Sequence, residues 1–274
     1  MGQKVKRKFV TFADSRMKSA LSRIEQQARE MDFFDEIEVL NEKMLDAEFV
    51  KKNAHLMRPG VRGFGFWVWK PYVIWRALKQ LKEGEELYYI DAGCHLNPGG
   101  RKRMEDYAVM LRQGDFKMAA FALESDCSEK AFTKMDLLVH MGVEKRADIV
   151  ESGQLCTGHI FCVKCPEVMQ FVEEWQRAWD DIHLIDDSPS IRPNYPEFVE
   201  HRHDQSVFSI LCKLHGAVAL PGNETWPANN SRQWGTMSSY PIWDKRDLGF
   251  TMHTLERAAR KVRKIWARLR SRIR

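Results

Sequence analysis

The feature that most constrains the fold is an alternation of strand-like runs with amphipathic helices. Residues 8–14 are rich in β-branched and aromatic side chains, which is typical of a strand. Residues 17–31 place apolar side chains at three- and four-residue steps, which predicts a helix. A second short strand is expected at 37–40. This β-α-β opening favours the α/β class.

The alternation continues to about residue 216. We expect helices after Pro71, at 104–113, at 130–140, after Pro166 and from Asp204, and strands at 86–90, 116–123 and 156–163. Asp204 is the expected N-cap of the last of these helices, which Gly216 closes. The connection at 182–202 is long, and loops of that length are usually functional or mobile.

Length and composition point to one globular domain. The chain has 274 residues, of which 44% are hydrophobic and 30% charged, so it can bury a core. No apolar run is long enough for a membrane span, and the first residues lack a signal-peptide core. The six cysteines are then expected to be reduced thiols in the cytoplasm. We predict a catalytic domain over residues 1–245.

The basic charge is concentrated at the C-terminus. Residues 251–274 carry nine Lys or Arg and one acid, so the rest of the chain is net negative. Apolar residues recur there at helical spacing, which predicts a basic amphipathic helix over 246–274. Such a helix suits an anionic membrane surface, although nucleic acid or an acidic partner would attract the same charges. We favour the membrane because the apolar stripe is continuous, and expect no nucleic acid.

An acidic residue follows the strand predicted at 86–90. Asp91 and Gly93 stand where open α/β sheets place ligands. Mg²⁺ and Mn²⁺ prefer carboxylate oxygens and leave positions for substrate phosphates, so such a site suits a nucleoside diphosphate. A purely structural role explains the pattern equally well: Asp91 would begin a turn in which Gly93 takes a positive φ.

The motifs at residues 87–93, 156–163 and 204–209, taken in that order, resemble those of glycosyltransferases with the GT-A fold. Residues 87–93 resemble the strand and DxD element whose acids hold a metal on a nucleotide sugar. Residues 156–163 resemble the Asn-x-Gly strand of glycogenin-like retaining enzymes, and residues 204–209 are similar to their Asp-Gln element. The resemblance implies a single GT-A-like (Rossmann-like) domain with a mixed central sheet flanked by helices.

The resemblance also implies roles for individual residues. Asp204 and Gln205 would contact the transferred sugar, and Asp91 and His253 would bind the divalent cation. A further set would bind substrate: Asp14 at the nucleoside, Arg62 and Lys70 at the diphosphate, and Asp91, Gly93, Thr157, Gly158 and His203 around it. Gly93 replaces the second acid of DxD, so Mn²⁺ or Mg²⁺ would lose one carboxylate.

These features predict a retaining glycosyltransferase. It would move a sugar from a nucleotide-diphosphate donor to a glycan or lipid-linked acceptor, such as a lipopolysaccharide or capsule precursor, at the inner face of a membrane. The alternative is a nucleotide- or nucleic-acid-binding module that acts through the basic C-terminal helix. A nucleotidyl or phosphoryl transferase would share the acidic strand end, but the sequence contains no Walker phosphate loop.

Overall fold

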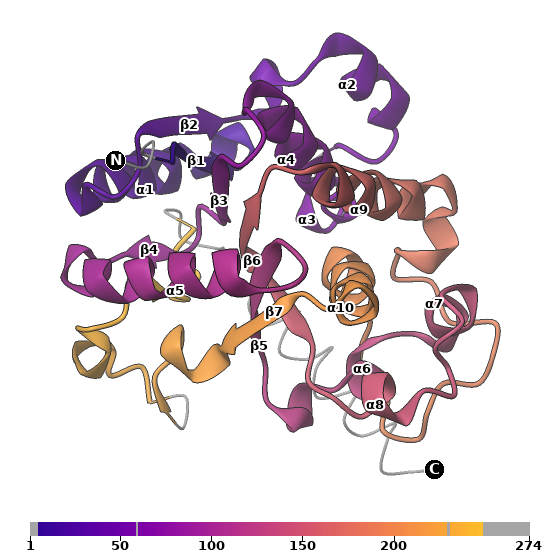
Figure 1. The fold of residues 1–274 in the computed structure, drawn as a ribbon. Helices are drawn as coiled ribbons and strands as arrows, with labels where there is room; N and C mark the ends of the chain where they lie inside the picture. The colour runs from indigo at the N-terminus through magenta and orange to yellow at the C-terminus, as the bar shows by residue number, and fades with distance from the viewer. Residues whose placement is uncertain (1–4, 59, 229–230, 249–274) are drawn as a thin grey trace.

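The computed structural model describes residues 5–58, 60–228 and 231–248. They form a mixed α/β domain around a six-stranded sheet with the order β2-β1-β3-β6-β5-β7 (Figure 1). The strands of this sheet are β1 (Arg7–Phe12), β2 (Glu36–Leu40), β3 (Glu86–Ile90), β5 (Met118–Ala122), β6 (Leu155–Val163) and β7 (Val218–Pro221). β6 runs antiparallel to β3 and β5, whereas β1 is parallel to β2 and β3, and β7 to β5.

Helices cover both faces of this sheet. They are α1 (Lys18–Met31), α2 (Ala47–Asn53), α3 (Gly63–Phe66), α4 (Trp69–Gln80), α5 (Arg101–Gln113), α6 (Glu129–Phe132), α7 (Met135–His140), α8 (Ala147–Val150), α9 (Pro166–Arg177) and α10 (His203–His215). Leu87 and Tyr89 of β3 pack into a core with α4, α9 and α10, whereas Tyr88 and Ile90 pack with α1 and α5. The alternation of side chains along a strand thus fills two separate cores.

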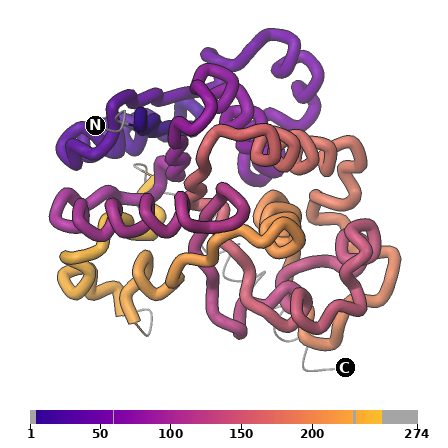
Figure 2. The backbone as a smooth tube through the Cα atoms, in the orientation of Figure 1, coloured from indigo at the N-terminus to yellow at the C-terminus, as the bar shows by residue number. Residues whose placement is uncertain are grey.

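A second, two-stranded sheet lies beside the end of β3. β4 (His95–Leu96) pairs antiparallel with β8 (Ile242–Trp243), which brings the chain around residue 244 back to the segment that follows Asp91. Figure 2, coloured by residue number, shows the backbone path of the segment that contains β8. Two short strands therefore join segments that are about 150 positions apart in sequence.

The sequence predictions held best for the long, strongly patterned elements. The strand at 86–90, the helix after Pro71 and the helix opened by Pro166 are all present. The helix predicted at 130–140 is instead two short helices, α6 and α7, because Thr133 and Lys134 adopt extended conformations between them. The side chains of both residues are buried; the Thr133 hydroxyl donates to Glu129 in α6, and the Lys134 ammonium donates to the carbonyl oxygen of His183 in the loop at 182–202.

The predicted N-cap at Asp204 is wrong. The cap position falls at Arg202, and His203 begins α10 with a positive φ of 50°. Asp204 therefore lies within the first turn and its buried side chain faces other residues of the domain.

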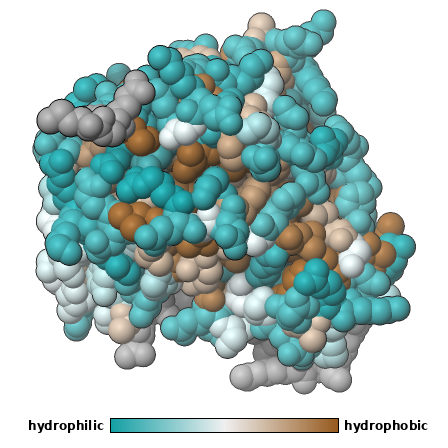
Figure 3. All heavy atoms as spheres, viewed as in Figure 1, coloured by the Kyte–Doolittle hydropathy of each residue, from teal (hydrophilic) through white to brown (hydrophobic). Residues whose placement is uncertain are grey.

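One face of the domain is mostly polar. The face shown in Figure 3 is largely hydrophilic, with hydrophobic side chains in small groups. Among the described residues, no helix is long and apolar enough to cross a membrane. The helix predicted over 246–274 falls almost entirely outside the described residues, which end at 248.

Candidate functional site

Asp91 lies at the open end of the central sheet. Every residue of β3 is buried, and Asp91 is the first residue beyond it, with a side chain that is 33% exposed. Its backbone N–H donates to the carbonyl of Gly158 on the neighbouring strand β6, 2.8 Å away. The hydroxyl of Tyr89 donates to Asp91 Oδ1 over 2.5 Å. The carboxylate is therefore held in place while it still meets solvent.

A buried lysine joins Asp91 to Asp204. Lys70 comes from the first turn of α4, and its side chain is only 1% exposed. Its Nζ lies 3.1 Å from Asp91 Oδ1, 3.3 Å from Asp204 Oδ2 and 3.1 Å from the carbonyl oxygen of Thr157. Burial alone would lower the pKa of Lys70, but the two carboxylates outweigh it and raise the pKa from its ordinary value. An ammonium group thus bridges two acids from distant segments.

Asp204 is the most enclosed member of this cluster. Its side chain is 5% exposed, and burial raises its pKa above the ordinary value for a carboxyl group. The charge of Lys70 and a hydrogen bond with the Thr157 side chain act in the opposite direction. The structure therefore brings Lys70, Asp91, Thr157 and Asp204 together, although they come from four separate elements.

Gln205 lies next to this cluster but its side chain bonds elsewhere. Its Nε2 donates to Gln154 Oε1 over 2.8 Å. Gln154 in turn donates from its own Nε2 to Glu129 Oε2 and Thr133 Oγ1, at 3.0 and 3.1 Å. A buried hydrogen-bond network thus fixes which way the Gln205 amide is turned.

A left-handed turn precedes Lys70. All five residues 63–67, which include α3, have positive φ values between 50° and 99°. Glycine adopts such angles freely, but Phe64, Phe66 and Trp67 adopt them at an energetic cost. The indole N–H of Trp69 donates to the carbonyl of Gly63 over 3.0 Å, which fixes the turn against the start of α4.

Sequence reasoning missed a second polar cluster beside Asp91. Asp244, directly after β8, accepts a hydrogen bond from the Cys94 thiol at 3.2 Å, and its Oδ2 lies 3.3 Å from His159 Nε2. Burial acts to raise the pKa of Asp244, but His159 and Arg246 outweigh it and hold the pKa at about 2. Burial also raises the pKa of the Cys94 thiol well above its usual range. No motif marked Asp244, because only the pairing of β4 with β8 brings it here.

Gly158 lies between the two acidic positions. A Cβ on this residue would be 3.8 Å from Asp91 Oδ2 and 3.7 Å from Asp244 Oδ1. Both carboxylates thus turn an oxygen toward the same point above a residue that has no side chain. Gly93, the other glycine of the predicted site, accepts a hydrogen bond from the N–H of Asp247 over 2.9 Å.

Three predicted residues bond to groups outside this cluster. Arg62 pairs with Asp187 at 3.1 Å, in the loop at 182–202. His203 is buried, and its Nδ1 lies 2.6 Å from the carbonyl oxygen of Ile185. Asp14 follows β1 and pairs with Arg16 at 2.7 Å, which lowers its pKa even though burial acts to raise it. Their assigned roles stay predictions, as does that of His253, which lies outside the described residues.

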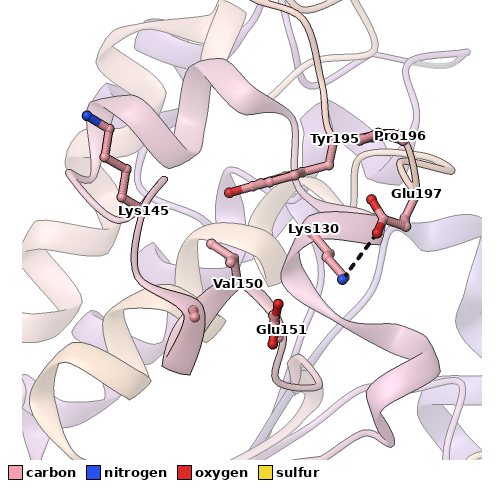
Figure 4. A pocket seen from close by; sticks show the side chains of 8 residues that line it. Lys130, Lys145, Val150, Glu151, Tyr195, Pro196 and Glu197 are labelled. Atoms are coloured by element: carbon pink, nitrogen blue, oxygen red, sulfur yellow. Dashed lines mark ion pairs between the residues drawn. The ribbon is translucent and has the colours of Figure 1, made fainter.

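Two cavities lie away from this cluster. One of about 340 Å³ opens between α6, α8 and the loop at 195–197, where Lys130 and Glu197 form an ion pair of 3.2 Å (Figure 4). Another of about 240 Å³ is lined by Asp136 and His183 among others. Neither shares a lining residue with the cluster around Lys70. The candidate site is therefore defined by its polar side chains.

Comparison with known proteins gives structural matches only. No family model and no curated protein matches the sequence. The fold is similar to that of a glycosyltransferase involved in glycosylation of the major capsid of PBCV-1, with 8% identity, 87% of this chain and 93% of that chain covered, and a TM-score of 0.47. Mouse xyloside xylosyltransferase 1 shares 10% identity, with 88% of this chain and 97% of that chain covered and a TM-score of 0.47.

A third match is GlyE, a glycosyltransferase of Streptococcus pneumoniae. It shares 12% identity over 88% of this chain and 55% of its own, with a TM-score of 0.45. By their descriptions, two of these matched proteins are glycosyltransferases and one is a xylosyltransferase, and each TM-score is below 0.5.

Proposed function

We propose that this protein is a glycosyltransferase that moves a sugar from a nucleotide-diphosphate donor to a glycan or lipid-linked acceptor. The observation that carries the proposal is the ammonium of Lys70, which contacts both Asp91 and Asp204. Transfer of a sugar needs positive charge where the diphosphate leaves and polar groups where the sugar is held. The cluster offers both within a few ångströms.

Each side chain has a role in this proposal. Lys70 stabilises negative charge that develops on the leaving diphosphate, because an ammonium in a buried setting interacts strongly with an anion. Asp204 accepts hydrogen bonds from hydroxyls of the donor sugar, and Thr157 and Gly158 line the same place from β6. The amide nitrogen of Gln205 is held by Gln154, so its amide oxygen is the atom that we assign to brace the sugar where an oxocarbenium-like centre forms. Retention follows from the likeness of the Asp-Gln element to those of retaining enzymes.

A divalent cation fits the Asp91 end of this site. The Asp91 carboxylate is one-third exposed, and its Oδ2 faces the space above Gly158 that no side chain fills. Carboxylate oxygens are the donors that Mn²⁺ and Mg²⁺ prefer. When bound, such a cation would supply further positive charge to the donor diphosphate. Lys70 provides part of that charge from the chain itself.

The proposal includes a lipid-linked acceptor and a location at a membrane surface. The basic amphipathic segment at 251–274 would hold the enzyme on an anionic membrane, close to a lipid-linked acceptor. A lipopolysaccharide or capsule precursor at the cytoplasmic face fits such an enzyme. The catalytic domain would then occupy residues 1–245, and the basic segment would be its membrane contact.

The test combines donor binding with one substitution. UDP-, GDP-, CMP- and dTDP-sugars are screened by thermal shift with and without Mn²⁺, since a specific ligand raises the melting temperature. Asp91→Asn is then expected to lower sugar transfer or donor hydrolysis by about a hundredfold or more while the protein stays folded. The matched control is Asp126→Asn, at an exposed acid outside the cluster. Unchanged activity in Asp91→Asn, or strong RNA binding without any binding of nucleotide sugars, would contradict the proposal.

A further inference from the structure

The end of β3 has one acid, Asp91, where the DxD motif described above has two. Gly93 has no side chain, and the space beside it is taken by the late segment of the chain. A Cβ on Gly93 would lie 3.4 Å from Leu248 Cδ2 and 3.7 Å from Arg246 Cα. The segment at 244–248 therefore lies against the very position where the second acid of the motif would project.

The same segment brings a carboxylate of its own. The β4–β8 pairing ends one residue before Asp244, whose side chain is 19% exposed. Hydrogen bonds with Cys94 and His159 fix the orientation of this carboxylate. Its Oδ1 faces the point above Gly158 that Asp91 Oδ2 also faces. A Cβ on residue 158 would contact both oxygens.

We propose that Asp244 supplies the second carboxylate for a divalent cation that Asp91 and Asp244 hold together above Gly158. This inference rests on the proposed function, because the cation would serve the donor diphosphate. Oxygen donors from two carboxylates, with the remaining positions left to phosphate and water, suit Mn²⁺ or Mg²⁺. Cys94 and His159 act as positioning residues, which hold the ligand rather than contact the substrate.

Charge supports the same assignment. Three carboxylates, those of Asp91, Asp204 and Asp244, gather around Gly158 and Lys70, whose ammonium contacts two of them. His159 and Arg246 are the basic groups that act on Asp244. Like charges in one site repel one another, and a dication bound by Asp91 and Asp244 would offset that repulsion.

A second set of potential metal ligands lies beside this site. Cys94, His159 and Asp244 place potential ligand atoms within 4.8 Å of one another, a set that could hold a transition metal. In the structure, the Cys94 thiol donates a hydrogen bond to Asp244 Oδ1 and His159 contacts Oδ2. These contacts orient the carboxylate so that Oδ1, which accepts from Cys94, also faces Gly158.

Mn²⁺ binding to the full chain tests the proposal without reference to catalysis. Mn²⁺ is titrated in the presence of UDP, and free Mn²⁺ is followed by its electron paramagnetic resonance signal. We expect Asp244→Asn to weaken Mn²⁺ binding by about tenfold or more, as loss of a carboxylate ligand should. The matched control is Asp126→Asn, at an exposed acid outside the site, which is expected to bind Mn²⁺ like the natural chain.

A second variant covers the case in which Asp244→Asn fails to fold. Gly158→Ala places a methyl group at ordinary contact distance from both carboxylates, so the fold should tolerate it. We expect it to weaken Mn²⁺ binding several-fold, whereas Gly235→Ala, where nothing lies within 4 Å, should not.

Three outcomes would overturn the proposal. They are unchanged Mn²⁺ binding in folded Asp244→Asn, unchanged binding in Gly158→Ala, and bound zinc in the purified protein that Cys94→Ser removes. The proposed function would survive any of these results if nucleotide sugars still bind and Asp91→Asn still abolishes transfer. Absence of nucleotide-sugar binding would instead remove the proposed function, whatever the chain does with Mn²⁺.

Discussion

At the scale of single residues, Lys70 connects stability with the candidate chemistry. Its ammonium is buried and contacts two carboxylates and a backbone carbonyl. A buried charge that loses its partner is strongly destabilising, because the remaining charge is neither solvated nor paired. Removal of Lys70 would leave Asp204 in this state, while the more exposed Asp91 could turn to water.

Lys70→Met should therefore destabilise the protein by about 3 kcal/mol at neutral pH. The raised pKa of Lys70 means that its contribution is fully present below its unfolded pKa and is lost as the pH rises through the higher folded value. The loss on substitution should accordingly shrink only at strongly alkaline pH. Urea unfolding measures both effects.

A second substitution separates charge from packing. Adding Asp204→Asn to Lys70→Met removes the unpaired carboxylate and should recover part of the lost free energy of unfolding. The exposed Lys51 serves as the control, since Lys51→Met should change stability by less than about 0.5 kcal/mol. A fully additive double variant would show that the two side chains do not act as a pair.

At the scale of elements, the left-handed turn at 63–67 fixes where α4 begins and so where Lys70 lies. Positive φ at three aromatic residues persists only because the surroundings enforce it. A Cβ on Gly63 would lie 2.3 Å from the ring of Trp67, which leaves no room for any side chain. The turn thus depends on glycine both for its backbone angle and for the close approach of an indole ring.

Gly63→Ala should destabilise the protein by about 2 kcal/mol or more, because it adds a steric clash to an unfavourable φ. Gly60→Ala is the matched control: its φ is +90°, but nothing lies within 4 Å of the added methyl group. It should show only the cost of the backbone angle, about 1 kcal/mol. Equal melting temperatures for the two variants would rule out the clash with Trp67.

Sequence patterns predicted these elements to different degrees for physical reasons. The strand at 86–90 is buried throughout and followed by an acid and a glycine, so its pattern and end were both visible. The two-residue strand β8 carries no periodic pattern, because its position depends on pairing with β4. Asp204 has the side chain of an N-cap, but the buried ammonium of Lys70 lies within reach of its carboxylate.

At the scale of the whole molecule, the candidate site exists because the sheet brings distant segments together. β3 and β6 are antiparallel neighbours, so the end of β3 meets the beginning of β6, where Thr157 and Gly158 lie. Motif order predicted that Asp91 and Asp204 belong to one site, and the structure places both against Lys70. Asp244 could not be predicted in the same way, because its place depends on how the last described segment packs.

The basic C-terminal segment belongs to the same scale, because under the proposed function it would hold the whole protein at a membrane. Vesicles of phosphatidylcholine with about a third phosphatidylserine should bind the full chain at low salt, with about 1 kcal/mol from each basic residue near the surface. A variant in which four basic residues of the segment are replaced by Gln should bind vesicles more weakly in cosedimentation, by about a hundredfold or more. These residues are Arg257, Arg260, Lys264 and Arg268. In the control variant, four exposed lysines of the described domain are replaced by Gln, with little expected effect on vesicle binding. These are Lys18, Lys43, Lys51 and Lys102. Equal loss in both sets would mean that net charge alone drives binding, and tighter binding to RNA than to vesicles would assign the segment to nucleic acid.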